Sequence, residues 1–321
     1  MADQSKFIWF NGKIIPWNNA RIHVMSHVLH YGSGVFEGIK CYSTDKGPAI
    51  FRLEEHISRL IESGKKYGIQ IPFANNDLIE ACIETVHLNG FESCYIRPIA
   101  FYGYDTLGVH PKDCPVEVAV ASFFWGAYLG DDGLANGVNI VISPWKRLSL
   151  DAFPPSAKAS GQYLNSMLAV QDARKQGYDE SLLLNQKGYI AEGSGQNIFI
   201  VKDKKIYTND VNASILVGIT RNSIIQISKD LNYSVEIADL TEEMLFNADE
   251  AFFTGSATEV TPIATVNDKP IGNGKPGSIT LELKDLYLRI VHGKECQYQR
   301  WLTYVNTPVN PQEPALEESS E

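Results

Sequence analysis

The sequence predicts an α+β fold in two domains, and three observations support this prediction. Short apolar or alternating runs typical of strands are interspersed with segments in which apolar residues recur at helical spacing. A break rich in glycine and acidic residues lies at 126–137, with few residues that could build a core. No repeat of 20–50 residues is visible, which argues against a solenoid. We therefore expect domains at 1–125 and 138–305, joined by a linker loop at 126–137.

The first domain is expected to open with a β-hairpin at 7–17. Its turn is predicted from Asn11-Gly12, because both central residues of such a turn accept positive φ. A helix beginning near residue 53 follows from helical spacing of apolar and aromatic residues, namely Leu53, His56, Ile57, Leu60, Ile61 and Tyr67. We also expect a helix at 77–88 and strands at 35–42, 49–53, 94–102 and 116–124.

The second domain is expected to contain a series of strands and three longer helices. The helices are predicted at 161–175, 218–231 and 281–292. The strands are predicted at 138–145, in a β meander through 181–208, and at 234–237, 250–254 and 260–266. The tail at 306–321 has three prolines, four glutamates and no basic residue, which predicts a disordered acidic appendage.

Composition narrows the class of protein. The 28 Lys and Arg against 38 Asp and Glu give a net charge of −10, which disfavours a nucleic-acid partner. No apolar run reaches the ~18–20 residues of a membrane span, and the start lacks the layout of a secretory signal. The 5 cysteines are an odd number without close pairing, so they indicate neither a disulfide framework nor a metal site. We expect a reduced, cytoplasmic protein without a membrane partner.

Four motifs stand out in a fixed order along the chain, and each has an ordinary structural explanation when taken alone. A lysine surrounded by small residues is most often a surface lysine, a glutamate after a strand a turn acid, a threonine at a helix start an N-cap, and a Gly-Ser-Ala run a hairpin turn. The four are Lys158 within SAKASG, Glu192 within GYIAEGSGQN, Thr220 within VGITR, and Gly255-Ser256-Ala257.

Together the motifs match what pyridoxal 5'-phosphate requires. A lysine amine forms the Schiff base with the cofactor aldehyde, and a carboxylate keeps the ring nitrogen protonated so that the ring acts as an electron sink. A helix start offers free N–H groups to a phosphate, and a turn of small residues exposes further N–H groups. The combination therefore predicts a cofactor site, although no single motif does.

At this point the chain resembles the branched-chain amino acid aminotransferases, class IV aminotransferases of pyridoxal-phosphate fold type IV. The resemblance runs from about residue 7 to about residue 302. It is carried by HYGSGVFEGIK at 30–40, FRL at 51–53 through RL at 59–60, YIRP at 95–98, FWGAYLG at 124–130, AKA at 157–159 and GSATEVTP at 255–262, with the Glu192 and Gly218 segments. It implies a small α/β N-terminal domain and a larger C-terminal domain with mixed sheets forming a pseudo-barrel, as in D-amino acid aminotransferase, which binds the cofactor.

The resemblance also implies roles for individual residues. Lys158 would be the Schiff-base lysine and proton carrier, Glu192 would pair with the pyridine nitrogen, and Tyr163 would lie near the ring's 3-hydroxyl. Without the family, Arg59 reads as an ordinary residue on a helix face. The remaining residues implied to bind the cofactor, mainly around its phosphate, are Arg59, Leu216, Gly218, Ile219, Thr220, Gly255 and Ser256.

The implied reaction exchanges the amino group of L-leucine, L-isoleucine or L-valine with 2-oxoglutarate, giving branched 2-oxo acids and L-glutamate by a ping-pong route. Arg97 would meet the glutamate side chain, while Tyr95 and the backbone of Ser256 and Ala257 would take the α-carboxylate. The implied side-chain pocket is lined by Tyr31, Phe36, Val109, Trp125, Tyr128 and Tyr163. Because Tyr31 and Val109 would come from a partner subunit, the resemblance implies at least a homodimer, and some relatives are hexamers.

Alternatives remain open at this stage. D-amino acid or (R)-amine transaminases share the lysine and the glutamate but typically lack the Phe-Glu-Gly stretch at 36–38. Aminodeoxychorismate lyases typically place a threonine where this chain has Gly38. A catalytically silent scaffold would first lose Lys158 or Glu192, and both are present. An unrelated α+β enzyme would not show these motifs in this order. The ranking of donors and the physiological direction stay open.

Overall fold

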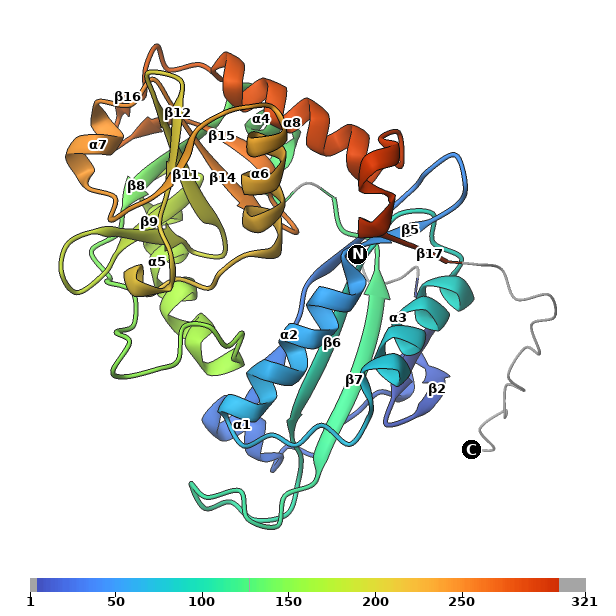
Figure 1. The fold of residues 1–321 in the computed structure, drawn as a ribbon. Coiled ribbons are helices and arrows are strands. Elements are labelled where there is room, and N and C mark those ends of the chain that lie inside the picture. Colours follow the sequence, from blue (N-terminus) through green and yellow to red (C-terminus); the bar gives the residue numbers. More distant parts are fainter. Residues whose placement is uncertain (1–4, 127, 306–321) are drawn as a thin grey trace.

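The computed structural model describes residues 5–126 and 128–305, in which helices flank two β-sheets (Figure 1). The first sheet runs in the order β17-β5-β4-β6-β7-β1-β2, with β3 paired to β6, and its pairs are antiparallel. Its strands are β1 (Phe7–Phe10), β2 (Lys13–Pro16), β3 (Gly34–Phe36), β4 (Ile39–Tyr42), β5 (Ala49–Phe51), β6 (Cys94–Tyr102), β7 (Val116–Phe123) and β17 (Leu302–Tyr304).

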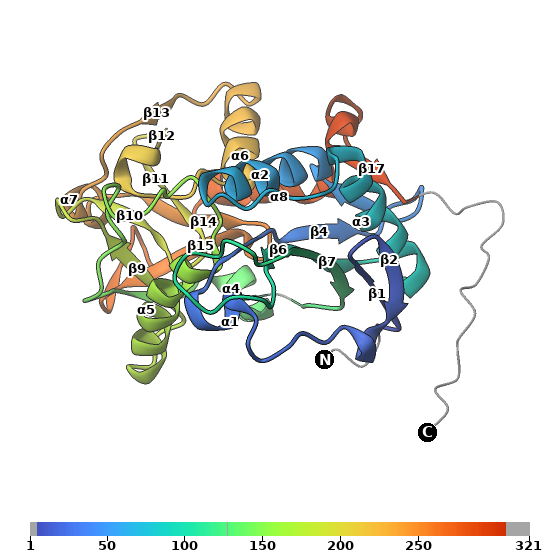
Figure 2. The ribbon, with the colours of Figure 1, turned by 90° about the horizontal axis from the view of Figure 1, so that it is seen from below.

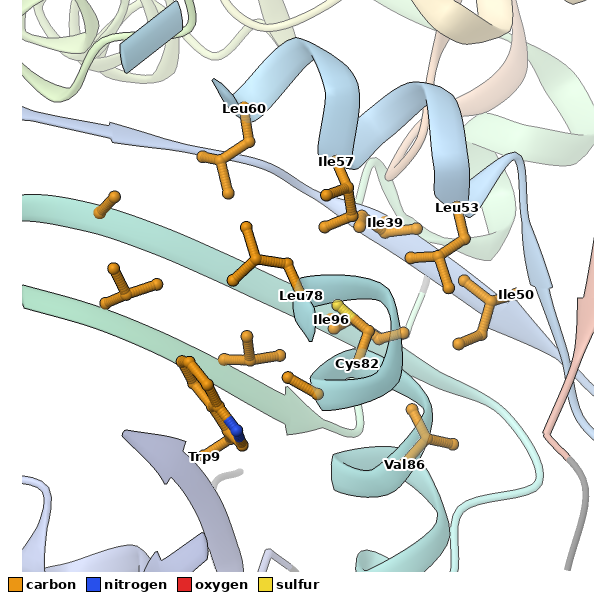
Figure 3. Close-up of a cluster of buried hydrophobic side chains, with 14 of the residues drawn as sticks. Trp9, Ile39, Ile50, Leu53, Ile57, Leu60, Leu78, Cys82, Val86 and Ile96 are labelled. Atoms are coloured by element: carbon orange, nitrogen blue, oxygen red, sulfur yellow. The ribbon is translucent and has the colours of Figure 1, made fainter. Parts of the chain in front are cut away.

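Two helices, α2 (Leu53–Lys66) and α3 (Asn75–Asn89), cover the same face of this sheet (Figure 2). Figure 3 shows Leu53, Ile57 and Leu60 of α2 directed toward Ile39 and Ile96 of the sheet. The spacing of these leucines and isoleucine places them on one helix face, where burial stabilises the fold by about 1.5–3 kcal/mol for each side chain. The amphipathic pattern of α2 therefore fixes this helix on the sheet.

The second sheet is mixed and curled. It runs in the order β10-β9-β8-β15-β14-β11-β12-β13, with β16 paired to β15. A tight turn joins β10 to β11, where Gly193 N donates to Gln196 O at 2.8 Å, so the start of this path returns to a strand five places further on. Its strands are β8 (Val138–Ile142), β9 (Glu180–Leu184), β10 (Ile190–Gly193), β11 (Asn197–Lys202), β12 (Lys205–Thr208), β13 (Val235–Ile237), β14 (Glu250–Gly255), β15 (Glu259–Val266) and β16 (Lys269–Pro270).

The two sheets share a core beneath the last long helix. Phe51 of the first sheet packs edge-on against Tyr287 of α8, with ring centroids 5.6 Å apart. None of the described helices is long and apolar enough to cross a membrane. The remaining helices are α1 (His27–Tyr31), α4 (Gly130–Asn136), α5 (Tyr163–Lys175), α6 (Ile219–Asp230), α7 (Glu242–Phe246) and α8 (Ser278–Val291), with 3-10 turns η1 (Trp17–Asn19), η2 (Ser160–Gln162), η3 (Val211–Ala213) and η4 (Cys296–Trp301).

Several predicted elements are confirmed, and three need correction. The hairpin turn has φ of 48° at Asn11 and 88° at Gly12, as the Asn-Gly signal requires. The single strand expected at 35–42 is wrong, because the chain breaks between β3 and β4. The meander expected through 181–208 is also wrong, since β10 and β11 lie at separate places in the sheet order. Local alternation predicts strands but not which strands pair.

The third correction concerns the chain between the expected domains, which is more structured than its composition indicates. Residues 130–136 of the expected linker at 126–137 form α4, although glycine is a poor helix former. At the other end of the chain, β17 pairs with β5 and so completes the first sheet. The division into 1–125 and 138–305 stays a prediction, and the expected disordered tail lies outside the described residues.

Candidate active site

Two adjoining cavities lie between the curled sheet and the first sheet, and most of the predicted site residues line one or both. The first cavity is lined by Arg59, Tyr95, Lys158, Tyr163, Glu192, Leu216, Gly218, Ile219, Thr220, Gly255, Ser256 and Ala257, among others. The second, of about 470 Å³, is lined by Phe36, Tyr95, Arg97, Trp125, Tyr128, Lys158, Tyr163 and Ala257, among others. Lys158 and Tyr163 stand at the junction, because they line both.

Lys158 is held through its main chain, which leaves its amine facing the cavities. Its N–H donates to Ser63 Oγ at 3.0 Å, and its carbonyl accepts from Phe36 N at 3.0 Å. The Nζ atom donates to Tyr163 Oη at 2.6 Å. The lysine thus links the first sheet and α2 to the start of α5, with its nucleophilic atom at the junction.

Glu192, at the end of β10, is a buried carboxylate with a cationic partner. Its Oε1 accepts from Arg147 Nε at 2.8 Å, while its Oε2 accepts from Leu216 N at 3.2 Å and Asn197 Nδ2 at 3.3 Å. Burial raises the pKa of Glu192, and Arg147 opposes that rise. A carboxylate in this setting gains from a nearby protonated ring nitrogen, since the proton would compensate its desolvation.

Arg59 of α2 reaches the first cavity under the control of a second buried carboxylate. Its Nε and NH2 donate to the two oxygens of Glu37 at 2.6 and 2.9 Å, a bidentate pair, and its NH1 donates to Val217 O at 3.1 Å. His56 Nδ1 also contacts Glu37, at 2.7 Å. Burial alone would raise the pKa of Glu37, but Arg59 and His56 hold it well below its usual range. The guanidinium is therefore fixed before any anion arrives.

The start of α6 and the turn after β14 complete the first cavity. Gly218 is the N-cap of α6 and has no side chain to cap the helix, so the N–H groups of the first turn are left for an anion. Asn197 Nδ2 donates to Leu216 O at 2.9 Å and so fixes the segment that leads into the helix. Thr220 and Ser256 add hydroxyl groups to the same lining.

The second cavity has aromatic walls and one arginine. Tyr95 packs edge-on against Trp125 at 4.6 Å between centroids, and the Arg97 guanidinium lies 4.9 Å from the centre of the Phe36 ring. Arg97 Nε is buried and has no hydrogen-bond partner among the described residues. A side chain at Gly38 would collide with the Tyr95 hydroxyl, so the glycine is needed for that approach.

Two predicted pocket residues do not line either cavity of this subunit. Tyr31 and Val109 are 44% and 80% exposed. The Tyr31 hydroxyl donates to Leu107 O at 2.7 Å, which ties α1 to the β6–β7 connection. Figure 1 shows these two segments at the same end of the first sheet. This placement agrees with the expectation that they serve a neighbouring subunit.

Comparison with known proteins decides the family. The family model "Amino-transferase class IV" matches residues 34–266. This chain belongs to the class IV aminotransferases. A branched-chain-amino-acid aminotransferase of Pseudomonas aeruginosa is 43% identical over 305 residues, which cover 95% of this chain and 99% of the relative.

Solved class IV structures have the same fold as this chain. A branched-chain amino acid aminotransferase from the source abbreviated T.th. superposes with a TM-score of 0.91 at 48% identity, covering 94% of this chain and 99% of the other. That protein was solved with pyridoxamine 5'-phosphate. The Escherichia coli branched-chain amino acid aminotransferase gives a TM-score of 0.92 at 41% identity, covering 94% and 100%. The expected two-domain fold of type IV is thus confirmed.

The residues of this class IV aminotransferase fit pyridoxal 5'-phosphate, the cofactor of its family. A lysine amine, a buried carboxylate, an uncapped helix start and a fixed arginine converge on one cavity. These groups match the aldehyde, the ring nitrogen and the phosphate of the cofactor in number and in charge. The fit rests on the donor set of the chain itself.

Sequence reasoning missed the partners of the charged site residues. Arg147 pairs with Glu192 from 45 residues away, and no local pattern around it pointed to the site. Glu37 lies in the Phe-Glu-Gly stretch that drew attention to the family, yet its pairing with Arg59 could not be read from that stretch. Asn197, at the end of the GYIAEGSGQN segment, connects Glu192 to the start of α6.

Proposed function

We propose that this class IV aminotransferase transfers the α-amino group of L-leucine, L-isoleucine or L-valine to 2-oxoglutarate. The products are the branched 2-oxo acids and L-glutamate. The observation that carries the proposal is the cofactor cavity opening into an aromatic pocket with an arginine in its wall. Curated relatives and solved structures named branched-chain aminotransferases match this chain over nearly its whole length, which supports the choice of substrate.

The chain supplies a proton carrier and a charge partner for this reaction. Pyridoxal 5'-phosphate, when bound, supplies an electron sink for the electrons left behind when the substrate loses its α-proton. Lys158 Nζ, at the junction of the cavities, is placed to take that proton and to return it to the product. The Glu192 carboxylate keeps a proton on the ring nitrogen, and Arg147 keeps Glu192 ionised.

The pocket must accept both an aliphatic and a charged side chain. Burial of an aliphatic side chain stabilises binding by about 1.5–3 kcal/mol, whereas breaking or leaving unpaired a buried charge costs about 3–5 kcal/mol. The aromatic walls suit leucine, and the partnerless Nε of Arg97 suits the side-chain carboxylate of glutamate or 2-oxoglutarate. The T.th. relative was solved with a phosphopyridoxyl derivative of L-glutamate and with 4-methylvaleric acid, two ligands of these two kinds.

The proposal is tested by trapping the lysine and by a donor panel. Borohydride reduction of the purified holoenzyme followed by peptide mapping should label Lys158. The panel compares L-Leu, L-Ile, L-Val, L-Glu, L-Phe and D-Ala with 2-oxoglutarate as acceptor. We expect turnover with the branched L-amino acids. Turnover restricted to D-alanine would instead indicate a D-amino acid or (R)-amine transaminase, and a label elsewhere would contradict the site.

We also propose a homodimer as the smallest complete unit, because Tyr31 and Val109 line no cavity of their own subunit. Further exposed apolar residues on α5, Leu164, Met167 and Leu168, give such an interface apolar area. Mixing Lys158→Ala and Tyr31→Ala variants during refolding should recover part of the activity, since a mixed dimer holds one intact site. No recovery from co-refolded variants would contradict shared sites. A cytoplasmic location stays a proposal that rests on the odd number of cysteines.

A further inference from the structure

Glu180, the first residue of β9, is fully buried, and its donors are uncharged. Its Oε1 accepts from Ser181 N at 2.7 Å and from Ser181 Oγ at 3.3 Å. Its Oε2 accepts from Ser194 Oγ and from Gln196 Nε2, both at 2.9 Å. All the hydrogen-bond donors recorded for it in the described part of the chain are neutral groups. Burying a carboxylate in this way costs free energy, so its presence calls for an explanation.

Two chains of hydrogen bonds run from this carboxylate to the wall of the substrate pocket. In one chain, Gln196 Nε2 donates to Glu180 while Gln196 Oε1 accepts from Gly195 N at 3.0 Å. In the other, Ser194 gives its hydrogen to Glu180, and its oxygen is left to accept from the hydroxyl of Tyr128. Ser194, Gly195 and Gln196 line both cavities, and Tyr128 lines the second.

The direction of every bond in these chains depends on an acceptor that offers no hydrogen. An ionised carboxylate accepts from Ser194 and Gln196 together, which orients the Gln196 amide so that its oxygen faces Gly195 N. A neutral amide at position 180 would present an NH₂ group to at least one of these donors. The turn at 194–196 and the Tyr128 ring would then lose a fixed position.

We propose that Glu180 is a positioning residue for the substrate side-chain pocket, acting through Gln196 on the Gly195 backbone and through Ser194 on Tyr128. Glu180 lines neither cavity and touches no reacting atom. The inference rests on the proposed function for the identity of the pocket's ligand. It predicts that Glu180 affects how tightly branched side chains bind rather than how fast the bound substrate reacts.

The chain offers a matched control in Glu250, at the start of β14. It is also buried and accepts only from neutral groups, namely Ile279 N at 3.1 Å, Thr280 N at 2.7 Å and Thr280 Oγ1 at 2.6 Å. It holds the start of α8 and lines neither active-site cavity. Replacing either glutamate by glutamine disturbs a buried carboxylate, but only Glu180 is connected to the pocket.

The experiment compares the wild-type holoenzyme with Glu180→Gln and Glu250→Gln. Binding of 4-methylpentanoate, which does not react, is measured by titration calorimetry, and KM and kcat are measured with L-leucine. We expect Glu180→Gln to weaken 4-methylpentanoate binding and to raise the KM about tenfold, which corresponds to about 1.4 kcal/mol. The kcat should stay within about threefold of wild type. Glu250→Gln should lower the unfolding temperature and leave Kd and KM unchanged.

A second set of variants keeps the inference open to refutation if Glu180→Gln does not fold. Tyr128→Phe and Ser194→Ala cut the same chain, so each should weaken 4-methylpentanoate binding and the double variant should be no weaker than the worse single variant. Unchanged binding in Glu180→Gln, equal weakening in Glu250→Gln, or additive effects of the two single variants would overturn the inference. A wild-type enzyme that binds 4-methylpentanoate but transaminates no branched donor would contradict the proposed function instead.

Discussion

The two ends of the active site treat buried charge differently. At the cofactor end, each buried carboxylate has a cationic partner, Glu37 with Arg59 and Glu192 with Arg147. At the substrate end, the Nε of Arg97 has no partner among the described residues, and Glu180 is held by neutral donors. The difference follows from what each end binds, since one holds a resident group and the other must exchange apolar and charged side chains.

Pairing at the cofactor end fixes geometry, because a bidentate pair leaves an arginine little freedom. An arginine paired in the same way at the substrate end would have to break its pair whenever glutamate entered. Stacking Arg97 over Phe36 instead keeps the guanidinium dry on its flat face and available at its edge. The substrate end therefore trades some stability for the ability to bind two kinds of side chain.

The largest expected effect comes from removing the charge at the ring-nitrogen position. Glu192→Ala should lower the rate of the half-reaction with L-leucine by about 10³-fold, because the protonated ring loses its partner. Much of the cofactor should remain bound through Arg59 and the start of α6. Stopped-flow absorbance measures the rate, with the exposed Glu62→Ala as control. Unchanged half-reaction rates would show that the pairing at this end is only structural.

The second prediction concerns the stability that pairing contributes. Glu37→Gln breaks a buried pair and should lower the free energy of unfolding by about 3–5 kcal/mol at pH 7. The pKa of Glu37 is held below its usual range, so its contribution is complete above the unfolded pKa of about 4.3 and is lost as the pH falls toward the folded value. Urea unfolding at pH 7 and pH 3 should show the gap between wild type and variant shrinking in acid. A gap that is the same at both values would refute the ionic origin.

The third prediction tests the substrate end. Arg97→Ala should reduce kcat/KM for 2-oxoglutarate about 10–100-fold, because a charged hydrogen bond is worth about 1.5–3 kcal/mol. The value for 4-methyl-2-oxopentanoate should change by less than about threefold. The exposed Arg174→Ala serves as a control for loss of one positive charge. Equal losses on both acceptors would show that Arg97 shapes the pocket without recognising the carboxylate.

The smallest effect is expected at Gly195, between the two ends. An added Cβ meets no atom within 4 Å, so it would extend into open space of the pocket. Gly195→Ala should leave stability nearly unchanged and shift the ratio of kcat/KM for L-leucine to that for L-valine by about tenfold toward valine, within the 1–3 kcal/mol of methylene discrimination. Steady-state kinetics with both donors measures the ratio. A ratio equal to that of wild type would indicate that the turn does not contact the side chain.

Much of the cofactor end could be predicted from the sequence, because its groups sit in short segments with local causes. The spacing from Leu53 to Leu60 predicts α2, and α2 carries Arg59. The small residues around Lys158, the strand end at Glu192 and the start of α6 are also local features. What local patterns could not supply was the curl of the second sheet, since strand alternation is the same whichever strand is the neighbour.

The order of motifs by itself determined that a lysine, a carboxylate and a phosphate-binding helix start occur together in this chain. Only the tertiary structure decided which charges are paired. Arg147 reaches Glu192 across 45 residues and Arg59 reaches Glu37 across 22, whereas Arg97 and Glu180 are left without ionic partners in the described part of the chain. Hydrogen bonding within a helix or turn joins residues a few positions apart, but the partner of a buried charge is set by the sheets that fold around it.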